Sequence, residues 1–191
     1  MDSLFAIKGK DFVLVVNETT VLHSIFKMKP NESKSYLLDN KILLSLAGDN
    51  ADRDKFGMLI ERNIQFLKFK NNTALTVEEV ANFTRTKLAE FIRKSPYQVS
   101  SLLTGYDDKR GPQVYWMDYL GTLGDVNYGS HGYAAYFVYS ILSNFWKPEL
   151  KLDEAIDIAK HCIAELRTRF MISQDHFVLK VIDKEGIRNI N

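Results

Sequence analysis

The chain has 191 residues, of which 46% are hydrophobic, and its 25 basic and 24 acidic residues give a formal net charge of +1. Such a length and hydrophobic content suit one domain with a sizeable core, so we predict a single domain over residues 1–191. The balanced charge argues against a nucleic-acid partner, which would call for a basic face or stripe. No apolar run approaches the roughly 18 residues of a membrane helix.

The remaining bulk features indicate an intracellular chain. The single cysteine, Cys162, excludes an internal disulfide and suits a reducing compartment. The start "MDSLFAIKGK" lacks the basic and apolar regions of a signal peptide. We therefore expect the N-x-S/T sites to be unmodified; they lie at Asn17, Asn31, Asn71 and Asn82.

The first third of the chain has the alternation of strands. Residues 5–8 and 12–16 flank the turn "KGKD", and "SYLL" and "KILLSLAG" flank a turn at Asp39 and Asn40. The apolar run from Ile42 to Leu46 predicts a strand buried on both faces.

The pattern then changes to helical spacing. In the first predicted helix the spaced positions are Phe56, Leu59, Ile60, Asn63 and Leu67. A capping-box pattern, Thr76 with Glu79, begins the second, whose predicted inner face is Val77, Val80, Ala81, Thr84, Leu88 and Phe91. Pro96 is expected to stop this helix.

The second half repeats this order. Strands are predicted over 97–106 and 113–119, followed by a glycine-spaced loop over 121–132. A third helix is expected to gather Tyr133, Tyr136, Phe137, Ser140 and Ile141 on one side. The fourth gathers Ala155, Ile158, Ala159, Cys162, Ile163 and Leu166, and the chain ends with a strand over 177–181, a "DKEG" turn and a short tail.

The element order is therefore strands, two helices, strands, two helices, strands. Each helix pair needs a sheet face against which to bury its apolar side. Two stacked sheets, each covered outside by one helix pair, satisfy all of these faces. We predict an α+β fold with four layers, an αββα sandwich.

Residue patterns alone give no catalytic or metal site. The four histidines (His23, His131, His161 and His176) do not pair at a metal-ligand spacing, and Cys162 lies on an apolar stripe. The loop 121–132 contains neither a G-x-G-x-x-G motif nor a P-loop. We expect no metal and no cofactor, and a small-ligand site in this loop is the weakest alternative.

An αββα sandwich whose first strand starts at the chain's beginning resembles the N-terminal-nucleophile hydrolases, in which the first residue supplies both nucleophile and base. Several segments, in order, resemble proteasome beta subunits over essentially residues 1–191. They are "ILLSLAGDNADRDKF", "ANFTR", "SPYQVSSLLTGYD", "LLTGYDDKRGPQVYWMDYLGTL", "HGYAAYF" and "RFMIS…VIDKEGI".

The resemblance implies where the family's catalytic residues would fall. Met1 would stand at the position of the nucleophilic threonine and Asn17 at that of the orienting aspartate. Lys34 would match the lysine that depresses the threonine's pKa, and Gly132 the serine before the third helix. A thioether is no nucleophile for an amide, so we expect no catalytic residues and regard these four positions as vestigial.

Two hypotheses about function follow. In the first, the chain is a non-catalytic structural beta subunit, assembled with proteasome alpha and beta subunits in seven-membered rings in the cytoplasm and nucleus. In the second, it is an N-terminal-nucleophile amidase or peptidase in which processing exposes Ser3, Thr19 or Thr20. Cutting before Thr19 or Thr20 would remove the first two strands, which favours the first hypothesis.

Overall fold

The computed structural model describes residues 2–23, 26–172 and 174–190. Its first five-stranded sheet has the order β10-β1-β2-β11-β12. The strands of this sheet are β1 (Ser3–Lys8), β2 (Phe12–Glu18), β10 (Tyr128–Gly132), β11 (Phe177–Asp183) and β12 (Gly186–Ile190).

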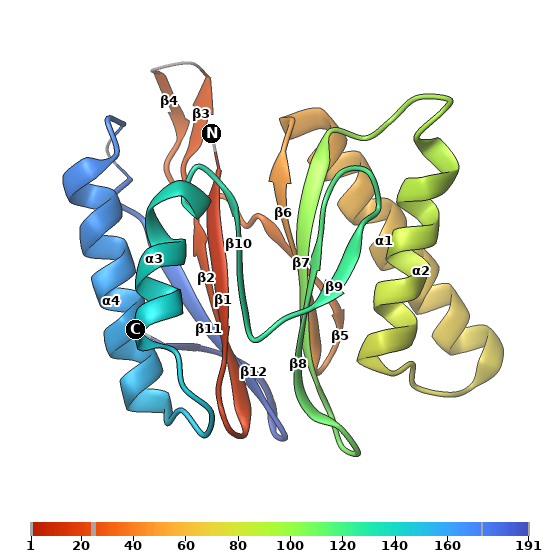
Figure 1. Cartoon of the computed structure of the whole chain (residues 1–191). Coiled ribbons are helices and arrows are strands. Elements are labelled where there is room, and N and C mark those ends of the chain that lie inside the picture. The colour runs from red at the N-terminus through yellow and green to blue at the C-terminus, as the bar shows by residue number, and fades with distance from the viewer. Residues whose placement is uncertain (1, 24–25, 173, 191) are drawn as a thin grey trace.

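The second five-stranded sheet has the order β5-β6-β7-β8-β9. Its strands are β5 (Ser35–Asp39), β6 (Ile42–Gly48), β7 (Val99–Asp107), β8 (Gly111–Met117) and β9 (Leu123–Asp125). A separate hairpin pairs β3 (Val21–His23) with β4 (Phe26–Lys29) and projects beyond the layers (Figure 1).

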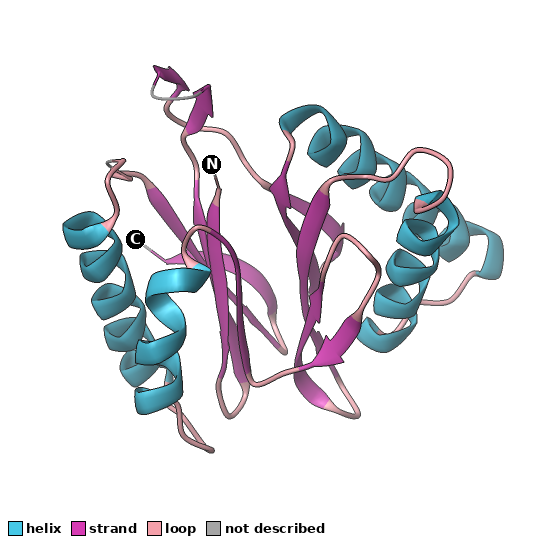
Figure 2. Ribbon diagram, turned by 45° about the horizontal axis from the view of Figure 1, so that its top comes forward, coloured by secondary structure: helices cyan, strands magenta, loops and turns pink. Residues whose placement is uncertain are grey.

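Two helix pairs cover the outer faces of the sheets. They are α1 (Asn50–Asn71) with α2 (Val77–Phe91), and α3 (Ala135–Phe145) with α4 (Leu152–Arg169). The helices α3 and α4 lie on the first sheet, and α1 and α2 lie on the second (Figures 1 and 2). The predicted αββα order of layers is confirmed.

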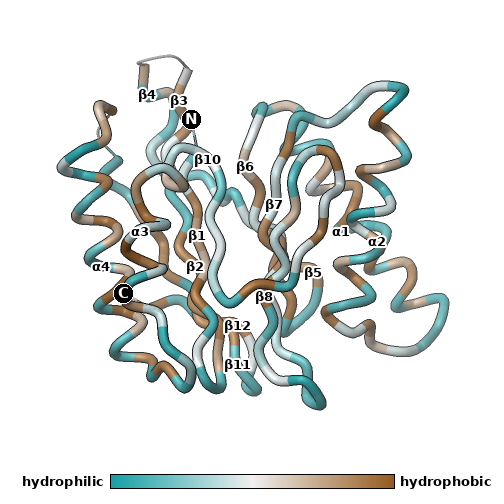
Figure 3. Tube along the Cα trace, in the orientation of Figure 1, coloured by the Kyte–Doolittle hydropathy of each residue, from teal (hydrophilic) through white to brown (hydrophobic). Residues whose placement is uncertain are grey.

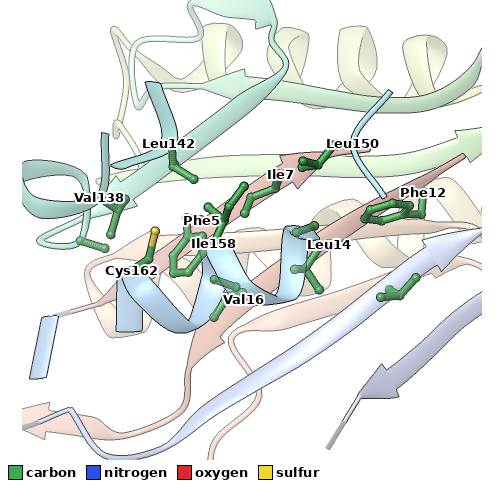
Figure 4. Close-up of a cluster of buried hydrophobic side chains, with 14 of the residues drawn as sticks. Phe5, Ile7, Phe12, Leu14, Val16, Val138, Leu142, Leu150, Ile158 and Cys162 are labelled. Atoms are coloured by element: carbon green, nitrogen blue, oxygen red, sulfur yellow. The ribbon is translucent and has the colours of Figure 1, made fainter. Parts of the chain in front are cut away.

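Three apolar clusters join these layers. The first cluster lies between the first sheet and α4 (Figure 4). Phe5 and Ile7 of β1 and Leu14 and Val16 of β2 pack there with Ile158 and Cys162 of α4. A second lies between α1, α2 and the second sheet, and a third fills the space between the sheets. In Figure 3 hydrophobic colour follows the paired strands, whereas the turns at the bottom of the view are hydrophilic.

Strand alternation explains why β1 is buried on both sides. Leu4 and Ala6 belong to the cluster between the sheets, whereas Phe5 and Ile7 belong to the helix-covered cluster. Because each face meets a different layer, the strand needs apolar residues at every position. Because the middle of β1 is buried on both sides, polar residues occur at its ends, and the candidate site lies at one of these ends.

Several predictions about elements were wrong. The segment 121–132 is not a loop throughout, since β9 and β10 form in it, and the tail after the "DKEG" turn is the strand β12. The β3–β4 hairpin was not predicted. On α3 the buried residues are Val138 and Leu142, while Tyr136 is 86% exposed and Phe137 and Ile141 are only partly buried.

The capping box that opens α2 is confirmed and gives the first testable prediction. Thr76 Oγ1 accepts from the Glu79 N–H at 3.2 Å, and the Glu79 carboxylate accepts from the Thr76 N–H at 2.8 Å. Thr76→Ala should lower the free energy of unfolding by about 1 kcal/mol in a denaturant titration. The control Thr73→Ala removes an exposed loop hydroxyl and should have almost no effect; equal losses would refute the capping role.

Candidate functional site

Lys34 is the predicted site residue around which the structure builds a charged cluster. It lies just before β5, and its side chain is only 1% exposed. Its Nζ lies 2.7 Å from Asp2 Oδ1, donates to Glu18 Oε2 at 2.7 Å and donates to the Thr20 carbonyl at 2.8 Å. The three donors of the ammonium therefore meet three acceptors, which holds Lys34 in place inside the fold.

Asp2 joins this lysine to the start of α1. Its Oδ1 also accepts from Arg53 Nη1 at 3.2 Å, and its Oδ2 accepts from the backbone N–H of Gly48 at 3.0 Å. Arg53 reaches further, donating from Nη2 to Glu32 Oε1 at 2.7 Å. We call Asp2, Glu18, Glu32, Lys34 and Arg53 the ion cluster.

The topology brings these residues to one end of the sandwich. Because β1 and β2 pair antiparallel, with Leu4 opposite Asn17, the start of β1 and the end of β2 lie side by side. Gly48 ends β6, and Asp49 caps α1 by accepting from the N–H groups of Ala51 and Asp52. The next turn of the helix then carries Arg53 inward. In Figure 1 this end is at the top, beside the marked N-terminus.

The acidic partners of Lys34 were not predicted from the sequence. Asp2 and Glu18 both contact this lysine, at 2.7 Å each. The amide of Asn17 instead donates to Ser45 Oγ at 3.1 Å, in the opposite sheet. Met1 lies outside the described residues, so its match to the family's first residue stays a prediction.

A signal for Arg53 and Glu18 existed in the sequence. Arg53 stands three residues before Phe56 and seven before Ile60, on the stripe of α1 that faces the sheet. A charge on such a stripe needs a buried partner. Glu18 is the last residue of β2, after the apolar run Phe12–Val16 and Asn17, and the end of a strand is a place where a charged side chain can meet a buried partner.

Gly132, the fourth predicted position, shapes the backbone around Asp2. It pairs with Ser3 in the β1–β10 ladder and has a φ of +73°. A Cβ built on it would lie 1.9 Å from the carbonyl oxygen of Asp2, and the N–H of Tyr133 donates to this same oxygen at 3.0 Å. Glycine is therefore required where β10 passes the start of β1.

A cavity of about 570 Å³ opens beside Asp2, with Gly48, Gly132, Tyr119, Tyr133 and Tyr136 in its lining. The side chain presented there is a carboxylate already bound by two cations. Burial by itself raises the pKa of Asp2, but Lys34, the Gly48 N–H and Arg53 outweigh it and lower the pKa below its ordinary value of 3.8. A carboxylate held in this way is a weak base and a weak nucleophile.

Asp2 gives the second testable prediction, a pH dependence. Because its pKa is lower in the folded chain than in the unfolded one, its contribution to stability is complete above pH 3.8. That contribution is lost as the pH falls below 3.8 through the folded pKa. The difference in unfolding free energy between the wild type and Asp2→Asn, measured from about pH 2 to about pH 6, should shrink at the acid end. A constant difference would contradict the assignment.

The hydroxyls considered for an enzymatic role are held inside the sheet region. Ser3 is 1% exposed within β1, and Thr19 Oγ1 donates to the carbonyls of Pro30 and His176 at 3.2 and 3.3 Å. The backbone N–H of Thr20 donates to Glu18 Oε1 at 2.5 Å. Ser3 therefore lies in a paired strand, and Thr19 and Thr20 are buried just after the end of β2.

The remaining reactive side chains serve packing. His131 stacks on Trp116 with ring centroids 4.8 Å apart, and burial lowers its pKa to about 4. Burial raises the pKa of Cys162 to about 12, so its thiol is unreactive at neutral pH. Within the described ranges no three His, Cys, Asp or Glu residues are grouped to hold a metal ion, and no helix is long and apolar enough to span a membrane.

The layers and the placement of the first strand define the class of protein: this is the N-terminal-nucleophile hydrolase fold. The sequence pattern of the family described as "Proteasome subunit" matches residues 2–182. The chain belongs to the proteasome subunit family.

Curated relatives match along the whole chain. "Proteasome subunit beta type-2-A" of Arabidopsis thaliana is 38% identical, over 99% of this chain and 93% of its own length. "Probable proteasome subunit beta type-4" of Schizosaccharomyces pombe is 39% identical over 100% of both chains. "Proteasome subunit beta type-4" of Saccharomyces cerevisiae is 34% identical, over 100% of this chain and 98% of its own length. The relatives bear the names of beta-type subunits.

Proposed function

We propose that the chain is a non-catalytic structural beta subunit of the proteasome core particle. In this role it takes one place in a seven-membered beta ring, stacked against alpha rings, and helps to enclose the chamber in which other subunits cleave proteins. Its setting is ATP- and ubiquitin-dependent protein degradation in the cytoplasm and nucleus. Membership of the family and relatives of the beta type support the assembly role.

The observation that carries the non-catalytic role is the chemistry beside Lys34. An N-terminal nucleophile needs a hydroxyl or thiol and a free α-amine on the same residue. Here the side chain that reaches Lys34 from the start of β1 is the carboxylate of Asp2. Two cations and a backbone N–H hold this carboxylate. The lysine is therefore used for structure.

An electrophilic inhibitor of threonine peptidases tests this proposal in the purified particle. The intact mass of every subunit is measured after treatment. Subunits with an N-terminal threonine should gain the mass of the inhibitor, and this chain should not. An adduct on this chain, or a mature N-terminus at Ser3, Thr19 or Thr20, would establish the enzymatic alternative.

Native mass measurement tests the assembly separately. The chain should be found in a large particle together with several different homologous subunits. Obligate interfaces in such assemblies bury on the order of 2,000 Å² or more. A stable monomer as the main form in cells would contradict the structural role, whatever the inhibitor experiment shows.

A further inference from the structure

A second polar cleft, separate from the cavity beside Asp2, opens where the two sheets meet. Its volume is about 280 Å³. It is lined by the end of β2, the segment 31–35, and strands β11 and β12, with Lys180 and Asn189 among its residues. Two of the positions matched to the family's catalytic set, Asn17 and Lys34, contribute to one wall of this cleft, whereas Lys180 and Asn189 on the other wall are not among those positions.

Lys180 is the unusual group in this cleft. Its Nζ donates to Ser35 Oγ at 2.7 Å, across the gap between the sheets. No carboxylate of the described residues lies within 4 Å of this ammonium, whereas Lys27, Lys41 and Lys68 each have one. Burial lowers the pKa of Lys180. A half-buried ammonium without a counter-charge favours the binding of an anion.

The other charges around the cleft are already balanced. Lys34 is paired with Asp2 and Glu18 at 2.7 Å each. The Glu32 carboxylate accepts from Arg53 at 2.7 Å and lies 3.5 Å from Lys29. Among the described residues that line the cleft, the charge left without an opposite partner is therefore the positive charge of Lys180.

Neutral donors stand beside this charge. Asn189 is the register partner of Lys180 in the β11–β12 ladder, so the two side chains project from the same face of the sheet. Directly opposite residues of this kind have Cβ atoms about 4.5–5.5 Å apart. The Asn189 side chain is exposed, and its amide can donate to an anion bound at Lys180. The hydroxyl of Ser33 lies 3.3 Å from that of Ser35 and extends the polar wall.

We propose that this cleft binds the carboxylate of an amino-acid-sized group, such as the carboxyl end of a peptide, through Lys180 and Asn189. A carboxylate matches the one uncompensated positive charge, whereas a phosphate would bring an excess negative charge close to Glu32. The volume is larger than a bare carboxylate needs and leaves room for one residue. This inference is independent of whether the chain is catalytic.

The probe is N-acetyl-alanine, which carries a carboxylate and one peptide N–H, added to the purified full chain. Its neutral counterpart, N-acetyl-alaninamide, and inorganic phosphate are the comparison ligands. Binding is followed by NMR through the backbone amide signals of Ser35, Lys180 and Asn189. We expect saturable shifts with N-acetyl-alanine, and neither saturable shifts with the amide nor tighter binding of phosphate.

Three variants locate the binding. Lys180→Gln removes the charge and should weaken the binding of N-acetyl-alanine about tenfold or more. Lys180→Arg keeps the charge and should stay within about threefold of the wild type. Lys184→Gln removes an exposed lysine on the nearby turn, outside the cleft lining, and should change nothing.

Several results would overturn the proposal. One is equal binding of N-acetyl-alanine and N-acetyl-alaninamide, and another is an unchanged affinity for N-acetyl-alanine in Lys180→Gln. Tighter binding of phosphate than of N-acetyl-alanine would make this an inorganic-anion site. Absence of saturable shifts would also overturn it. If Lys180→Gln does not fold, the acid–amide comparison on the wild type and the Lys180→Arg variant still decide.

Discussion

Replacing Asp2 by alanine is expected to lower the free energy of unfolding by about 3 kcal/mol, at the lower end of the roughly 3–5 kcal/mol for breaking a buried ion pair. Asp2 is 5% exposed and joins Lys34, Arg53 and the Gly48 N–H. The loss stays at the lower end because Lys34 keeps Glu18 and Arg53 keeps Glu32. Denaturant unfolding measures the change.

The matched control for this variant is Asp11→Ala. Asp11 is an exposed aspartate in the turn between β1 and β2, so the same atoms are deleted from a solvated position. Its unfolding free energy should change by less than about 0.5 kcal/mol. Asp2→Asn separates charge from volume, since the amide fills the same space. A loss in Asp2→Ala no larger than in Asp11→Ala would show that the ion cluster contributes little to stability.

Much of the fold could be predicted from the spacing of apolar residues in the sequence, and the strands β10 and β12 were missed for a shared physical reason. Alternating apolar residues and the capping box located most strands and α2 correctly. The missed strands β10 and β12 are short and contain glycine or polar residues, and their pairing with β1 and β11 stabilises them. Gly129 in β10 is opposite Ala6 of β1, and a Cβ there would also lie 3.0 Å from Leu102 Cδ2 of the other sheet.

Helix α3 was misjudged for a different reason. Its sequence is apolar on more than one side, so two sets of residues fit a helical stripe. The set at four-residue spacing, Ala134, Val138 and Leu142, packs against α4 and the first sheet, while Tyr133 and Tyr136 point away from the core. Periodicity cannot choose between two apolar stripes; the neighbouring layer decides.

The candidate site was predictable as a location but not as a set of contacts. Lys34 and Asn17 were predicted as site positions, but the residue of β2 that pairs with Lys34 is Glu18, one residue beyond Asn17. Successive strand residues point to opposite sides, so a shift of one residue exchanges a neutral amide for a carboxylate. The register that settles this is fixed by the pairing of β1 with β2 and β10.

Gly132→Ala is the second change for which we expect a large effect, about 2–5 kcal/mol of unfolding free energy. The φ of +73° strains any residue with a Cβ, and the added methyl would lie 1.9 Å from the carbonyl oxygen of Asp2. The strain contributes about 1–2 kcal/mol, and relieving the clash by shifting backbone contributes about 1–3 kcal/mol more. Chemical unfolding monitored by circular dichroism provides the measurement.

Gly111 offers a control that separates these two contributions. Its φ is also +73°, but a Cβ built there meets no atom of the described residues within 4 Å. Gly111→Ala should therefore cost only the conformational strain, about 1–2 kcal/mol. Because the backbone that must move in Gly132→Ala carries Asp2, that variant should also lose part of the acid-dependent stability assigned to Asp2. If both glycine variants lose the same stability, Gly132 is required for its backbone angle alone, and its close approach to Asp2 has no energetic role.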